Sequence, residues 1–109
     1  MTTEENPEDR IALLQRLAAE CLKNYHGGLA ELERLDRDLK SIIRALSDIA
    51  DPSWTKSLLR QWGQLEIIYA LALDEGRVQL SQDEENEVQD IVAGLIIEIR
   101  DHPSTNHGR

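Results

Sequence analysis

The sequence predicts an all-α fold, an antiparallel bundle of four helices, and three observations support this prediction. Apolar residues alternate at spacings of three and four from residue 11 to residue 49, which places them on one stripe of a helix. Leucine and isoleucine dominate the apolar set, with two tryptophans, two tyrosines and no phenylalanine. Helix start and stop signals divide the 109 residues into segments of similar length. A chain of this size forms one domain, expected over residues 7–102.

The first helix is expected to begin at Pro7. Asn6 is a favourable N-cap residue, and proline suits the first helical position. Glu8 and Asp9 then lie in the first turn, where the helix dipole favours negative charge. The helix is expected to run to about residue 25. Residues 1–6 are polar and are expected to fray.

The pair Gly27–Gly28 leaves two alternatives open. Glycine just past a helix end is a stop signal, yet the apolar stripe keeps its phase through Tyr25 and Leu32. A break at Gly27–Gly28 gives four helices of matched length that close as a bundle. A continuous helix over residues 7–50 with two shorter helices would instead leave residues 11–25 bare, and a dimer partner would have to cover them.

The flanks of the stripe exclude an isolated two-stranded coiled coil. Positions beside a coiled-coil seam are usually charged, but here they include Leu22, Leu29 and Ile43. The apolar face is therefore wide enough to pack against two neighbouring helices.

Two further helices follow from local signals. Asp51 and Pro52 form an N-cap and first-position pair, and that helix ends near Gly76. Trp62 lies on its apolar face and is predicted to be a core residue. Ser81 and Glu84 form a capping box that starts the last helix. This helix is expected to run to about residue 101, with residues 103–109 as a loose tail.

The net charge of −9 limits the partners that this chain can bind. An acidic chain repels phosphate backbones and anionic membranes, so we expect neither nucleic-acid nor membrane binding. A basic protein is the partner that the charge favours. No apolar run is long enough to cross a bilayer, and the acidic N-terminus is no secretory signal. A cytoplasmic location is therefore expected.

The sequence carries no catalytic or cofactor motif. A single Cys21 and three scattered histidines do not form a metal-ligand cluster, and no Glu-x-x-His pair is present. Cys21 and His26 are five residues apart, on different sides of a helix, so a nucleophile–base pair is not expected. Cys21 is predicted to be a small core residue. We therefore expect no enzyme activity, no metal and no cofactor.

The residues that we predict to bind a partner are one tryptophan and an acidic segment. Trp54 lies at a helix corner, where it either clamps the end of the bundle or forms an exposed anchor. Residues 74–90 hold seven carboxylates against one arginine, a charge that attracts basic surfaces. Alternatively, the carboxylates in the first turn serve only to stabilise the last helix. The acidic candidates are Asp74, Glu75, Asp83, Glu84, Glu85, Glu87 and Asp90.

Size and charge together predict a small, non-enzymatic, acidic protein-binding module. Immunity proteins and antitoxins that inhibit nucleases are acidic because the surface they cover is built to hold phosphates, and this analogy rests on charge and size alone. The alternative is a structural or assembly subunit that associates with itself through the stripe over residues 11–49, for which a homodimer is possible.

Overall fold

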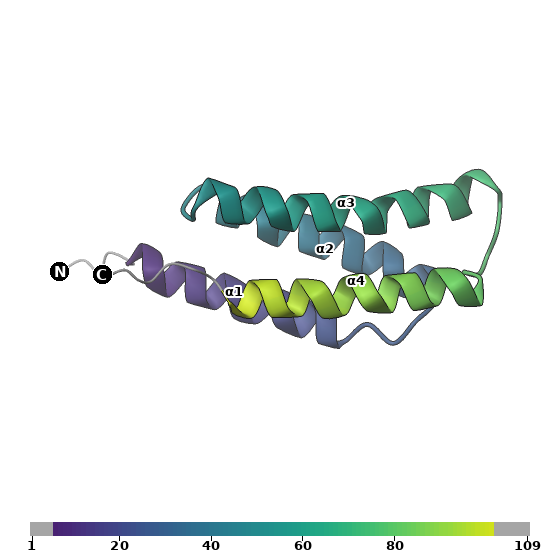
Figure 1. The fold of residues 1–109 in the computed structure, drawn as a ribbon, viewed down its shortest axis with the longest axis horizontal. Helices are drawn as coiled ribbons and strands as arrows, with labels where there is room; N and C mark the ends of the chain where they lie inside the picture. Colours follow the sequence, from purple (N-terminus) through teal and green to yellow (C-terminus); the bar gives the residue numbers. More distant parts are fainter. Residues whose placement is uncertain (1–5, 102–109) are drawn as a thin grey trace.

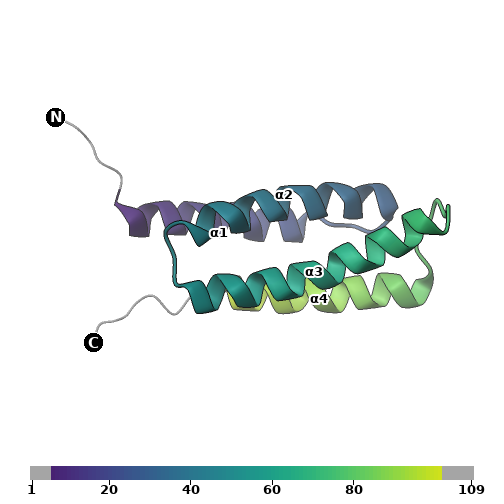
Figure 2. The same cartoon turned by 90° about the horizontal axis from the view of Figure 1, so that it is seen from above.

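The computed structural model describes residues 6–101, and these residues form four α-helices and no strand. The helices are α1 (Pro7–Lys23), α2 (Leu29–Ser47), α3 (Pro52–Asp74) and α4 (Gln82–Arg100). Consecutive helices run in opposite directions, so the α1–α2 and α3–α4 connections lie at one end and the α2–α3 connection at the other (Figure 1 and Figure 2). The predicted all-α antiparallel bundle of four helices is confirmed.

Side chains at the helix starts satisfy backbone N–H groups as the sequence predicts. The Asn6 carboxamide accepts a hydrogen bond from the Glu8 N–H at 2.9 Å, and Pro7 occupies the first helical position. The Asp51 carboxylate accepts from the Ser53 N–H at 3.2 Å ahead of Pro52. Asn6 is therefore an ordered cap. Of the segment over residues 1–6 that was predicted to fray, only Asn6 is described, and residues 1–5 and the predicted loose tail over residues 103–109 lie outside the described residues.

The chain breaks at Gly27–Gly28, so the continuous helix over residues 7–50 does not occur. Both glycines have positive φ angles, 112° and 100°. Residues with a Cβ rarely adopt such angles, and a right-handed helix requires negative φ. Helix α1 ends at Lys23, two residues before the predicted end, and α2 begins at Leu29.

The predicted stripe forms the core of a single chain. Its most buried members include Ala18, Leu32, Leu39 and Leu46, none of which is exposed. Two of the flanking residues that widen the stripe are buried as well, Leu22 in α1 and Ile43 in α2. Helices α1 and α3 each pack against both α2 and α4 and lie diagonally across the bundle. The wide apolar face thus contacts two neighbours, as predicted.

The described part of the chain contains no helix that is long and apolar enough to cross a membrane. The bundle measures 53 by 30 by 20 Å along its principal axes. All four helices carry charged side chains on their outer faces. Exposed aliphatic side chains lie on α1, α3 and α4.

Candidate functional site at the α3–α4 turn

A glycine-ended turn joins α3 to α4 and carries the acidic segment predicted from the sequence. Gly76 has a φ of 67°, a left-handed value that favours glycine. Its N–H donates to the Leu73 carbonyl and the Arg77 N–H donates to the Ala72 carbonyl, both at 3.0 Å. These two bonds form a Schellman motif, which ends α3 and directs the chain toward α4.

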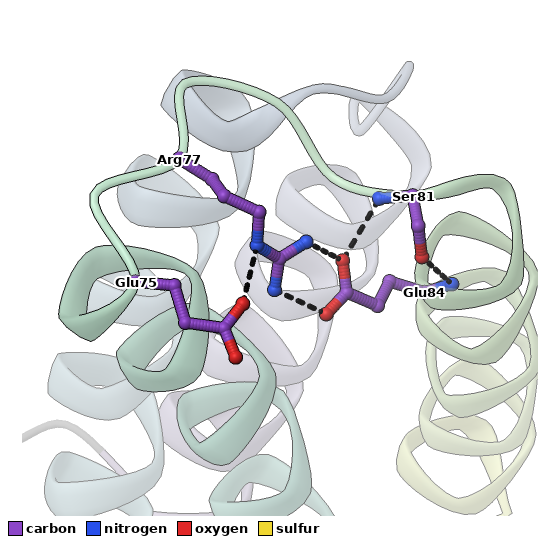
Figure 3. Close-up of polar contacts among 4 residues, drawn as sticks. All are labelled: Glu75, Arg77, Ser81 and Glu84. Carbon is purple, nitrogen blue, oxygen red and sulfur yellow. Dashed lines mark hydrogen bonds and ion pairs between the residues drawn. The ribbon is translucent and has the colours of Figure 1, made fainter.

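Arg77 holds two of the predicted carboxylates inside the turn (Figure 3). Its Nε donates to Glu75 at 2.7 Å. Its two terminal nitrogens donate to the two oxygens of Glu84 at 2.6 and 2.8 Å, a bidentate pair. The guanidinium lowers the pKa of Glu84 from 4.5 to about 2, and Glu84 in turn raises the pKa of Arg77. Arg77 thus offsets one of the two negative charges of Glu75 and Glu84 and holds both side chains at the turn.

Glu84 also closes the predicted capping box. The Ser81 hydroxyl accepts from the Glu84 N–H at 3.1 Å, and the Ser81 N–H donates to the Glu84 carboxylate at 2.8 Å (Figure 3). The carboxylate therefore caps α4 and binds Arg77 at the same time. These contacts are structural, and they agree with the alternative that the first-turn carboxylates stabilise the last helix.

Glu85 binds the α1–α2 connection, which lies at the same end of the bundle as the α3–α4 turn (Figure 1). One oxygen accepts from the Tyr25 hydroxyl at 2.9 Å and the other from the Gly28 N–H at 2.7 Å. Tyr25 is buried. Burial, and then the bond to Glu85, raise the pKa of the Tyr25 phenol well above its ordinary value of 10.0. Glu85 thus fixes the α1–α2 connection to the start of α4.

The four remaining acidic candidates are exposed. They are Asp74 at the end of α3 and Asp83, Glu87 and Asp90 in α4. Three aliphatic residues on α3 and in the turn are exposed as well: Ile67 by 60%, Leu71 by 50% and Val78 by 83%. We call these seven residues the α3–α4 face.

The helix register brings the two kinds of residue together. Ile67, Leu71 and Asp74 follow at spacings of four and three, so they share one side of α3. The Gln61 side chain lies against Gly94, which sets the antiparallel register of α3 and α4. Leu71 and Ile67 are then level with the first two turns of α4, where Asp83 and Glu87 project.

Trp54 is a clamp at the other end of the bundle. Its side chain is only 4% exposed, and its indole N–H donates to the Glu98 carbonyl of α4 at 3.0 Å. Of the two roles predicted for Trp54, the structure shows the clamp at the end of the bundle. Because the side chain is buried, it does not form an exposed anchor. Trp62 is a core residue as predicted, and its indole N–H donates to the Asp36 carbonyl at 2.9 Å.

A groove between α1 and α2 was not predicted from the sequence. Its volume is about 460 Å³, and Leu17, Cys21 and Ile42 supply apolar walls. Leu17 is 43% exposed at its edge. Cys21 packs against the core as predicted but also lines this groove. The sequence did not predict the groove because an apolar repeat indicates a buried face but not the space left between two helices.

The α1–α2 groove holds one thiol, that of Cys21. Burial and the neighbouring Asp38 raise the pKa of the Cys21 thiol from 9.0 to about 11, so at neutral pH it is protonated and a poor nucleophile. Within residues 6–101, no group of three or more metal-ligating side chains comes together. Comparison with protein families, characterised proteins and solved structures finds no match to this chain.

Proposed function

We propose that this chain is a non-enzymatic protein-binding module that docks on a basic protein through the α3–α4 face. The observation that carries the proposal is the presence of exposed aliphatic and exposed acidic side chains on the same surface. Ile67, Leu71 and Val78 are each at least half exposed, and four exposed carboxylates lie on the same two helices, α3 and α4. Solubility accounts for the carboxylates, and the exposed aliphatic groups on the same two helices add apolar surface that a partner can cover.

This arrangement has the anatomy of a protein interface. Apolar side chains that lose water on association supply most of the binding energy, and a polar rim surrounds them. Carboxylates in the rim speed the encounter with a basic surface and repel acidic ones. The same charge disfavours self-association through this face, because a second copy would bring carboxylates against carboxylates.

The turn that carries Val78 supports the proposal through its rigidity. Arg77, the residue before it, bonds to Glu75 and Glu84, and Gly76 closes the Schellman motif. These bonds constrain the backbone that directly precedes Val78. An anchor fixed in advance loses less conformational entropy on binding than an anchor on a loose loop.

The kind of partner follows from the charge. A surface that binds nucleic acid is rich in lysine and arginine, and an acidic module that covers it would block access to phosphate. We therefore propose an inhibitor of the immunity-protein or antitoxin type. The net charge of −9 supports this role.

The test is capture of a partner from cells, followed by measurement of its association rate. Asp83, Glu87 and Asp90 are replaced together by lysine in one variant. In a matched control, Glu33, Asp48 and Glu66, which are also exposed, receive the same change of charge. The first variant should associate with the captured partner at least about tenfold more slowly and with a weaker salt dependence, while the control stays closer to wild type.

Two results would contradict this proposal. One is an association rate that falls equally in the two variants, because that would reflect total charge and not the α3–α4 face. The other is a dimer in solution that survives both substitutions, because that would favour self-association as a structural subunit.

A further inference from the structure

The α1–α2 groove is a second surface on which bare apolar side chains and carboxylates meet. It lies on the two helices that do not contribute to the α3–α4 face. Its lining comes from α1, the residues that follow it and α2. Leu17, Cys21 and Ile42 are partly exposed along it, above the buried Leu35. Its volume of about 460 Å³ lies within the range of about 300–1,000 Å³ that is common for ligand sites.

The shape of the groove fits a helix. It follows α1 from Leu17 to Asn24 and α2 from Glu31 to Ile42. At 1.5 Å per residue these stretches are about 10 and 16 Å long. A helix that lies along a groove of this length places side chains i, i+4 and i+7 into it, which span about 10 Å. Two antiparallel helices with apolar walls between them are also the surface on which a third helix packs in bundles.

The charged residues that line the groove indicate the charge of its occupant. Glu20, Glu31 and Asp38 line it against one cation, Arg34. Glu31 accepts a hydrogen bond from the His26 N–H at 2.8 Å, whereas Glu20 and Asp38 are exposed at the edges. A second copy of this acidic chain would be repelled from such edges. Lysine or arginine on the occupant complements them.

We propose that the α1–α2 groove binds a short amphipathic helix of a partner protein, with aliphatic side chains on the face that enters the groove and lysine or arginine at its margins. The proposal is independent of the one for the α3–α4 face, because the two surfaces share no residue. If both hold, the bundle contacts its partners on two sides.

The direct probe is a synthetic amphipathic peptide of about 15 residues, a length at which an isolated helix begins to be stable. It carries leucine at i, i+4 and i+7 and lysine on both flanks, with a fluorescent label for anisotropy. Two control peptides replace the lysines by glutamate or the leucines by serine. Wild-type protein should bind the lysine peptide at least about tenfold more tightly than either control.

Matched protein variants locate the binding. Leu17→Ser removes an exposed apolar wall, and the control Leu13→Ser removes a side chain of matching exposure, 42% against 43%, from the same helix but outside the groove lining. Glu20→Lys with Asp38→Lys reverses the edges, and Glu33→Lys with Glu66→Lys is the charge control. The groove variants should weaken peptide binding at least about tenfold, and the controls less than about twofold. Circular dichroism checks that each variant is folded.

Cys21 gives a second readout that does not depend on substitution. Its thiol lines the groove and is partly buried, so a bound helix should slow its alkylation by iodoacetamide at pH 9. The proposal is overturned if the lysine peptide does not bind at millimolar concentration, if it binds the Leu17→Ser variant as tightly as wild type, or if Cys21 reacts at the same rate with saturating peptide. A wild-type dimer that Leu17→Ser dissociates would also overturn it, in favour of a second copy.

Discussion

Two connections at the same end of the bundle are fixed by two adjacent carboxylates, and they differ in the range of their contacts. Glu84 fastens the α3–α4 turn through Ser81 and Arg77, residues within seven positions of it. Glu85 fastens the α1–α2 connection through Tyr25 and Gly28, which are 60 and 57 residues away. One connection is a local motif and the other depends on the assembled fold. Contacts with Glu85 should therefore contribute more to global stability.

The largest effect is expected from Glu85→Ala. This substitution removes two hydrogen bonds to a charged acceptor and leaves the buried Tyr25 hydroxyl without that partner. The free energy of unfolding should fall by about 3 kcal/mol, measured by urea denaturation at pH 7. Tyr25→Phe removes only one of the bonds and should cost about 1 kcal/mol. If Glu85→Ala lowers the free energy of unfolding by less than about 0.5 kcal/mol, the contacts of Glu85 with the α1–α2 connection do not contribute more to stability than the local contacts of the α3–α4 turn.

The glycines of the two connections provide the next comparison. Gly28 has φ 100° and ψ 153°, a region that is open almost only to glycine, whereas Gly76 has φ 67° in the ordinary left-handed region. A Cβ added at either position meets no atom within 4 Å, so backbone strain alone decides. Gly28→Ala should destabilise the protein by about 2 kcal/mol and Gly76→Ala by about 1 kcal/mol.

Thermal and urea unfolding of the two alanine variants, with Gly76→Asn as a control, check this order. Asparagine tolerates the left-handed region better than alanine does, so Gly76→Asn should lie closest to wild type. An equal loss of stability in Gly28→Ala and Gly76→Ala would mean that the α1–α2 connection rearranges to relieve its strain. A shift of Gly28→Ala to a dimer would show that the chain can instead form the long helix over residues 7–50.

A smaller effect, dependent on pH, should come from Glu84. Its folded pKa of about 2 lies below the ordinary value of 4.5, so its ionised form favours the folded state. The contribution is therefore complete above pH 4.5 and is lost as the pH falls toward 2. Glu84→Gln should be less stable than wild type at pH 7 and should approach it near pH 2. Because the pair with Arg77 is partly exposed, the difference should stay below that of Gly28→Ala.

Urea midpoints of wild type and Glu84→Gln between pH 7 and pH 2 test this pattern. The difference between the two proteins is the relevant quantity, since other carboxylates titrate in both. A constant difference over the whole range would mean that Glu84 acts through its capping geometry and not through its charge.

The sequence separation between contacting residues explains which features of the fold could be predicted. The caps at Asn6, Asp51 and Ser81 were predictable because donor and acceptor lie within a few residues. The break at Gly27–Gly28 remained one of two alternatives because the apolar phase continues through it. The bond that holds it comes from Glu85, 57 residues from Gly28, and no local pattern reports such a contact.

The candidate site divides in the same way. The capping role of Glu84 is visible in the sequence, but the contacts of Glu85 with Tyr25 and Gly28 appear only in the assembled fold. The role of Trp54 depends on the Glu98 carbonyl of a helix that lies 44 residues further on. The α1–α2 groove likewise exists only where two helices meet. Periodicity could therefore predict the fold more completely than the site.

The smallest effect is expected from Asp83→Asn combined with Glu87→Gln, on the side of α4 where the carboxylates are exposed. Asp83 lies in the first turn and contributes a few tenths of a kcal/mol through the helix dipole, and Glu87 contributes less. The free energy of unfolding should therefore change by less than about 0.5 kcal/mol. A loss above about 1 kcal/mol would place these residues with Glu84 and Glu85 as structural groups. A near-zero change would separate them from those two neighbours and leave them available to a partner.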